Sequence, residues 1–158
     1  MSKTTPATQF LTRADVTFTL ARYDYDPSVD RIGMAAAEAI GEPASRVLKT
    51  LMAEADGKPV CVVLPSDCEV SMKKLATAVG AKSATMMKPA EAERLTGYHV
   101  GGISPFGQKK KVLTVIEARA FEEPYVVVNG GQRGLQIRLS PADARAALQA
   151  IAAPVVAV

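Results

Sequence analysis

The residues best suited to chemistry lie together near the middle of the 158-residue chain, between Gly97 and Lys111. This segment, GYHVGGISPFGQKKK, holds four glycines and ends in three lysines. Glycine has no Cβ, so backbone N–H groups can approach a ligand closely, and neighbouring lysines attract phosphate. The segment therefore indicates a site for a polar, anionic ligand. A tight connection followed by a solvated run of charge fits the same residues.

The same glycines do not form a nucleotide-binding P-loop. Gly102 and Gly107 have the required spacing, but Gln108 and Lys109 stand where that motif needs Lys and then Ser or Thr. The motif also needs a following helix, whose N-terminus faces the phosphates. The β-branched run Val112–Ile116 predicts a strand instead.

Lys49 is a second candidate, because it interrupts an apolar segment. On a strand over Arg46–Ala53 it would share one face with Val47 and Leu51, and the other face is apolar too. Such a lysine either extends its ammonium out to solvent or points it into a pocket. In a pocket it could bind an anion or stabilise negative charge developing on a carbonyl oxygen.

The usual catalytic groups are missing from the sequence. No serine stands in a recognisable motif with a histidine and a carboxylate, and the single His99 falls in the glycine-rich segment. Cys61 and Cys68 are the only cysteines, too few with one histidine for a zinc site. Tyr23 and Tyr98 could stack on a ligand or donate a hydroxyl, although tyrosines are more often aromatic edges of a core. We expect neither metal nor cofactor.

The hydrophobic pattern predicts a mixed α/β (α+β) protein, a mixed sheet with helices packed around it. Capping residues and apolar spacing predict helices from Pro6, over Gly33–Ile40, from Ser71 to Gly80, over Pro89–Leu95, and after Ser140 with a face of Ala144, Leu148 and Ile151. Strands are expected at Thr17–Tyr23, Arg46–Ala53, Pro59–Leu64, Ser83–Met86, Val112–Ile116, Tyr125–Val128 and Leu135–Leu139. Asp56-Gly57 predicts a hairpin turn, and Asp24–Asp30 a polar loop.

Composition predicts one domain over residues 1–158. The chain is long enough for a proper core, and an apolar fraction of 48% with 22% charged residues is typical of soluble globular proteins. No apolar run approaches the roughly 20 residues that span a membrane, and no secretory signal is recognisable. We therefore expect a cytoplasmic protein. The net charge is only +3, but the lysines and arginines of the second half could form one basic face.

Several segments, spread in order over nearly the whole chain, match a known family. They are Thr5–Ala7, Tyr23 with Asp26-Pro27, Val47–Leu51, Lys73–Leu75 with Gly80–Lys82, Thr96–Tyr98, Gly101–Pro105 with Gly107–Lys110, and Gly130-Gly131 with Arg133–Leu135. On these motifs the sequence resembles the YbaK family of free-standing bacterial Cys-tRNA(Pro) deacylases, related to the editing domain inserted in bacterial prolyl-tRNA synthetases. The resemblance implies a compact mixed sheet curled into a partial barrel with flanking helices.

The resemblance also implies roles for individual residues. Lys49 would be the catalytic residue, near the phosphate and ribose of the terminal adenosine of the tRNA. The substrate-binding residues would line the aminoacyl pocket, with Tyr23 at its rim: Tyr23, Thr50, Gly101, Gly102, Ile103, Ser104, Asn129, Gly130, Gly131 and Gln136. The residues expected to contact the tRNA are Lys109, Lys110 and Arg133.

The implied activity is the removal of mischarged cysteine from tRNA in trans, by a hydrolase or lyase type of reaction. The substrate thiol attacks its own ester carbonyl, so that tethering supplies much of the rate and the glycine-loop amides stabilise the oxyanion. Prolyl-tRNA synthetase is the implied partner.

Asn129 and Gln136 depart from the family pattern, which has Ser and Asp at these positions. The substrate amino acid therefore stays open, with alanine, serine and proline as alternatives. A non-catalytic module that binds an aminoacyl-tRNA end or a synthetase, and an enzyme for another ester-linked nucleotide conjugate, also stay open.

Overall fold

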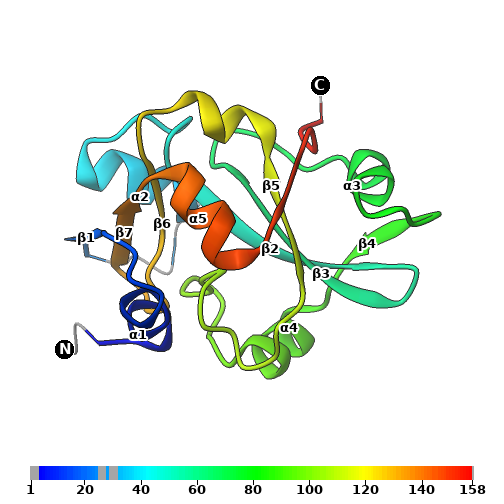
Figure 1. Cartoon of the computed structure of the whole chain (residues 1–158), viewed down its shortest axis with the longest axis horizontal. Coiled ribbons are helices and arrows are strands. Elements are labelled where there is room, and N and C mark those ends of the chain that lie inside the picture. Colours follow the sequence, from blue (N-terminus) through cyan, green and yellow to red (C-terminus); the bar gives the residue numbers. More distant parts are fainter. Residues whose placement is uncertain (1–3, 25–27, 29–31, 158) are drawn as a thin grey trace.

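A computed structural model of the chain describes residues 4–24, 28 and 32–157 (Figure 1). The helices and strands of this part of the chain follow in this order: α1 (Pro6–Arg13), β1 (Thr19–Arg22), α2 (Ile32–Ile40), β2 (Leu48–Ala55), β3 (Lys58–Pro65), α3 (Met72–Val79), β4 (Ala84–Met86), α4 (Pro89–Thr96), β5 (Leu113–Glu117), the 3-10 helix η1 (Ala118–Glu122), β6 (Val126–Asn129), β7 (Leu135–Leu139), α5 (Pro141–Leu148) and β8 (Ile151–Ala153). None of the helices described is both long and apolar enough to cross a membrane.

The strands form two sheets. The larger has the order β4-β2-β3-β5-β8, with antiparallel pairing on both sides of β2 and parallel pairing on both sides of β5. The smaller is antiparallel, with the order β1-β7-β6. A single parallel bridge between Val47 and Val127 joins them, just before β2 begins. The mixed α/β class with flanking helices is confirmed, but the strands do not close into a barrel.

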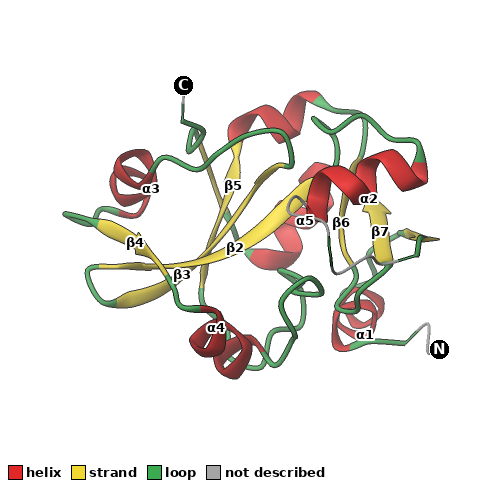
Figure 2. Cartoon of the chain, turned by 180° about the vertical axis from the view of Figure 1, so that it is seen from behind, coloured by secondary structure: helices red, strands yellow, loops and turns green. Residues whose placement is uncertain are grey.

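Helices cover both faces of the larger sheet, as alternation along β3 shows. Val60, Val62 and Leu64 belong to a core cluster that includes Leu75 of α3. Cys61 and Val63 face the opposite cluster, which contains Ala92 of α4 and reaches α1, α5 and the smaller sheet. After the exposed Lys58 the strand is apolar to its end, because both of its faces are buried. Figure 2 shows α3 and α4 on opposite sides of the sheet.

Local signals in the sequence set most element ends. Thr5 caps α1 in a reciprocal capping box with Thr8, and Ser71 and Ser140 cap α3 and α5. Glycine in the left-handed conformation ends α3 at Gly80 and α4 at Gly97. The expected helices and strands are all present, and apart from the end of the last helix their bounds shift by up to two residues. Most of the expected loop Asp24–Asp30 lies outside the described residues.

The prediction for the C-terminal end of the last helix was wrong. Gln149 takes the left-handed conformation, with φ of 53°, so α5 ends at Leu148. Ile151, assigned above to the helix face, instead opens β8 and pairs with Val115 of β5.

Candidate functional site

A pocket of about 460 Å³ lies along an open edge of β2. β4 pairs only with Ala53–Ala55, so the first half of β2 has no neighbour on that side within its sheet. The amide of Met87 donates to the Met52 carbonyl at 3.1 Å, which shows that the backbone groups of even-numbered residues face this side. The backbone N–H and C=O of Thr50 therefore face the open edge. The other walls come from the start of α4, the glycine-rich loop and the smaller sheet.

Lys49 and Thr50 both line this pocket. Lys49 is half-buried, and no hydrogen bond or ion pair of its ammonium is found among the described residues. The Thr50 hydroxyl is fully buried and also lacks a hydrogen-bond partner within that part of the chain. A buried hydroxyl without a partner costs about 1–3 kcal/mol.

The glycine-rich loop divides into a part that lines the pocket and a part that supports it. Gly101 and Ile103 line it, and Gly101 has a φ of 91°, which strongly favours glycine. Gly102 instead packs on the second glycine-rich turn, where a Cβ added to Gly102 would lie 2.9 Å from the backbone nitrogen of Arg133. Ser104 is fully buried, and its hydroxyl accepts a hydrogen bond from the Phe106 amide at 3.2 Å. Gly102 and Ser104 therefore shape the loop from outside the pocket lining.

The backbone amides of this loop are partly available. The Gly102 amide donates to the His99 carbonyl at 2.8 Å and is therefore occupied. No hydrogen bond of the Gly101 or Ile103 amide is found within the described residues. Both residues line the pocket, so these two amides are available to a ligand there.

Asn129 and Gln136 bring the smaller sheet into the site. They face each other as partners on β6 and β7, and both line the pocket. The Asn129 side chain donates to the Gly101 carbonyl at 3.1 Å and accepts from the Gly131 amide at 2.7 Å. It therefore fastens the two glycine-rich turns together as well as facing the pocket. Gln136 is buried, and its side-chain amide makes no hydrogen bond to the described residues.

Gly130 and Gly131 were expected to bind substrate, but they lie behind the pocket lining. The Gly130 carbonyl accepts a hydrogen bond from the Thr5 hydroxyl at 2.6 Å, and its amide donates to Leu135. A Cβ on Gly131 would lie 2.7 Å from the Tyr98 ring. Their close packing positions Asn129.

Tyr23 and Tyr98 have different places. Tyr23 lines the pocket at the end of β1, where its amide donates to Gly134 at 3.0 Å. Tyr98 is buried in the core and donates its hydroxyl to the Phe106 carbonyl at 2.6 Å. Burial raises the pKa of this phenol. Of the two tyrosines, only Tyr23 is placed for ligand contact.

The residues expected to contact tRNA lie outside the pocket lining and are exposed. Lys109 and Lys110 follow the glycine-rich loop directly. Arg133 donates to the Val100 carbonyl at 2.9 Å, so it also joins the two turns. Val100 lines the pocket, which places Arg133 beside its mouth.

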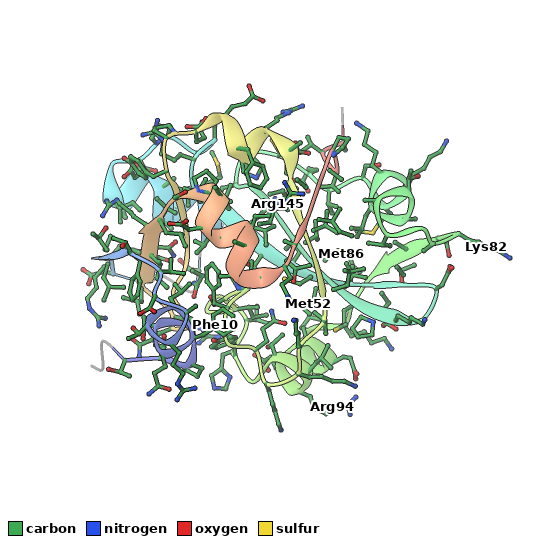
Figure 3. The ribbon with its side chains drawn as sticks, viewed as in Figure 1. Phe10, Met52, Lys82, Met86, Arg94 and Arg145 are labelled. Carbon is green, nitrogen blue, oxygen red and sulfur yellow. The ribbon has the colours of Figure 1, made fainter. Side chains whose placement is uncertain are left out.

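Two kinds of pocket residue were not predicted from the sequence. The first kind is methionine, and the pocket is lined by Met34, Met52, Met86 and Met87. Met52 and Met86 come from the neighbouring strands β2 and β4 (Figure 3). Ser66 and Glu69, from the loop after β3, also line it. No local signal marks these residues, because β4 pairing and the path of the loop bring them to the open edge.

The remaining reactive groups lie away from this lining. Burial raises the pKa of the Cys61 thiol to about 12, so Cys61 is protonated at neutral pH. His99 is exposed, with Nδ1 3.7 Å from a Glu93 carboxylate oxygen. Among the described residues no group of three His, Cys, Asp or Glu side chains could hold a metal ion.

Known proteins share both the sequence and the fold. The chain is 36% identical over 121 residues to EbsC of Enterococcus faecalis, a candidate Cys-tRNA(Pro)/Cys-tRNA(Cys) deacylase, covering 75% of this chain and 74% of that protein. It is 31% identical over 99 residues to a proline–tRNA ligase of Geobacter metallireducens, covering 63% of this chain but only 17% of the ligase.

A solved structure of a candidate trans-editing enzyme for prolyl-tRNA synthetase has the same fold, with a TM-score of 0.83 at 20% identity over 99% of this chain and all of that one. The model of the aminoacyl-tRNA editing domain matches residues 26–147. The chain therefore belongs to the aminoacyl-tRNA editing domain family.

Proposed function

We propose that this protein is a trans-acting deacylase that clears mischarged tRNA, with Cys-tRNA(Pro) as its preferred substrate. The observation that carries the proposal is the pocket itself. It is lined by Lys49, which has no partner in the described part of the chain, and by Thr50, the next residue of β2. Family membership and the similarity to EbsC support this interpretation.

Lys49 is the proposed catalytic residue. An ammonium at the open edge of β2 would stabilise negative charge, either on the terminal phosphate or on the ester oxygen as it departs. The free amides of Gly101 and Ile103 are suited to the oxyanion that forms on the attacked carbonyl. Thr50, Tyr23 and Gln136 line the same space and would orient the ester.

The substrate thiol is the proposed nucleophile. Its sulfur forms a bond to the ester carbon, the bond from that carbon to the ribose oxygen breaks, and the thiol proton ends on the ribose oxygen. The products are a cyclic thiolactone and free tRNA, which is a lyase-like outcome, whereas attack by water would give free cysteine. The thiol and the carbonyl are in one molecule, so the effective concentration of the thiol is high and the reaction needs no nucleophile from the protein.

The pocket lining favours a substrate whose side chain is small and contains sulfur. Four methionines and Ile103 make much of the wall apolar and polarisable, which suits a thiol better than a hydroxyl. Asn129 and Gln136 add neutral polar groups instead of a carboxylate. Alanine, serine and proline are the alternatives, and a size-selective pocket separates such close analogues only weakly.

The tRNA body is proposed to lie over the basic residues beside the pocket mouth. Lys109, Lys110 and Arg133 are exposed and would contact backbone phosphates. Prolyl-tRNA synthetase is the proposed partner, since part of the chain resembles a proline–tRNA ligase.

The test is a deacylation assay on tRNA(Pro) charged with cysteine, alanine, serine or proline. We expect fastest release of cysteine, with the thiolactone as first product. Protection of every ester would instead identify a binding module. Equal release from a short aminoacyl-nucleotide and from the full tRNA would indicate an enzyme for other ester-linked nucleotide conjugates.

A further inference from the structure

Two charged side chains line the described part of the pocket, and they have opposite signs. Lys49 comes from β2, and Glu69 comes from the loop that follows β3. Glu69 is exposed, which places it at the mouth. Neither side chain has a hydrogen bond or ion pair among the described residues, and the two do not pair with each other. Both charges are therefore free to meet a ligand.

The backbone of Glu69 is held in place although its side chain is not. The Glu69 carbonyl accepts a hydrogen bond from the Ala157 amide at 2.7 Å, and Val70 forms a bridge with Val156. The C-terminal segment that makes these contacts is itself fixed by a buried carboxylate. Glu117 Oε1 accepts hydrogen bonds from Val155 and Val156 at 2.8 and 3.2 Å. A fixed backbone keeps the Glu69 carboxylate near the pocket mouth, so that only its side chain has to be ordered when a ligand binds.

We propose that Glu69 binds the α-ammonium group of the aminoacyl substrate. This inference rests on the proposed function, because an aminoacyl ester on a terminal nucleotide carries an ammonium group and a phosphate at once. Lys49 suits the negative part and Glu69 the positive part. The polar residues deeper in the pocket, Asn129 and Gln136, are neutral and offer the ammonium no opposite charge.

The expected effect is modest and sensitive to salt. An exposed pair of opposite charges stabilises a complex weakly, so loss of the Glu69 charge should weaken binding by up to about fivefold. Exposed charges are screened, so the effect should shrink when the ionic strength rises towards about 1 M.

The experiment compares two non-hydrolysable probes. One is adenosine 5′-phosphate carrying cysteine on a 3′-amide, and the other is its counterpart without the α-amine. Wild type should bind the amine-bearing probe more tightly, and Glu69→Gln should abolish that preference while leaving the affinity for the deaminated probe unchanged. Asp67→Asn is the matched control, an exposed carboxylate of the same loop outside the pocket lining, and it should keep the preference.

An unchanged preference in Glu69→Gln would overturn the inference, as would an equal loss of affinity for both probes. The deacylation assay separates this outcome from failure of the proposed function. Deacylation by wild type together with an unchanged preference refutes only the role of Glu69. A preference that depends on Glu69, in a protein that cleaves no aminoacyl-tRNA, refutes only the deacylase. Failure to bind either probe refutes the role of Glu69 irrespective of activity.

Discussion

At the scale of single residues, Lys49 is where sequence pattern and pocket coincide. Lys49→Ala should lower deacylation by about a hundredfold or more, because no other cation in the described lining could replace its charge. The fold should survive, since no ion pair of Lys49 is lost within the described residues. Turnover of Cys-tRNA(Pro) and the melting temperature check both statements.

Lys82→Ala is the control for this change. Lys82 is exposed and extends from the far end of the larger sheet (Figure 3), remote from the pocket lining. It should keep wild-type turnover. A folded Lys49→Ala protein with near-normal turnover would remove Lys49 from the mechanism.

Gly101 gives a second test, because the effect of its backbone conformation can be separated from the effect of its position in the pocket. Gly101 and Gly57 both have positive φ, 91° and 80°, so alanine should cost each about 1 kcal/mol of stability through backbone strain. Only Gly101 lines the pocket, whereas Gly57 lies in an exposed turn. Gly101→Ala should therefore lose most deacylation activity while Gly57→Ala keeps it, at similar melting temperatures. Equal activities would mean that the loop is only a connection.

Residue types revealed only part of the site. Lys49 stood out because a charge inside an apolar strand is unusual, and Gly101 because glycines cluster around it. The sequence did not distinguish Gly101 from Gly102, since the difference depends on which residue packs against Arg133. Glu69 carries no local signal, because its place at the pocket depends on the C-terminal segment far along the chain.

At the scale of elements, a group of polar side chains links the segment between α2 and β2 to the smaller sheet. The Glu42 carboxylate accepts hydrogen bonds from Arg138 Nε and from the Tyr125 hydroxyl, each at 2.8 Å, and pairs with Arg46 at 3.6 Å. Burial raises the pKa of Glu42, but the hydrogen bonds and charges of its partners outweigh burial and lower it overall. The ionised form is therefore the one that stabilises the fold.

This linkage predicts how stability depends on pH. Because the pKa of Glu42 is lower in the folded state, its contribution is present above the unfolded value of 4.5 and is lost as pH falls through the folded value. Glu42→Gln should lower the free energy of unfolding by about 2 kcal/mol at pH 7. The gap from wild type should close at pH values below the folded pKa.

Urea unfolding at neutral and acidic pH measures that gap. Glu38→Gln, an exposed position on α2, is the control and should change little at either pH. A gap that is the same at both pH values would show that Glu42 acts through packing alone.

Helices and strands were easier to predict than their pairing. Capping residues and glycines mark the helix ends directly, so α1, α3 and α4 begin and end close to the expected residues. β8 was missed because it has three residues and depends on pairing with β5. The division into two sheets follows from long-range pairing, such as β1 with β7, which no local pattern encodes.

At the scale of the whole molecule, charge limits how tightly tRNA can be held. There are 19 basic and 16 acidic residues, a net charge of +3. The basic side chains beside the pocket mouth are few, and Arg94 extends from α4 into solvent while it pairs with Glu91 (Figure 3). Each phosphate contact costs about threefold in affinity between about 50 and 200 mM salt, so a small number of contacts predicts a shallow salt dependence.

If the tRNA body is bound only weakly, selection between different tRNAs must come from a partner protein. In the proposed function the pocket binds only the aminoacyl end, which is the same in Cys-tRNA(Pro) and Cys-tRNA(Cys), so the isolated protein should cleave both at similar rates. Prolyl-tRNA synthetase already holds tRNA(Pro), and its presence should raise the preference for Cys-tRNA(Pro) by tenfold or so, equivalent to about 1.4 kcal/mol. Deacylation of both tRNAs with and without the synthetase, together with a pull-down, measures this. Strong discrimination by the isolated protein, unchanged by the synthetase, would show that this chain itself contains the tRNA-reading surface.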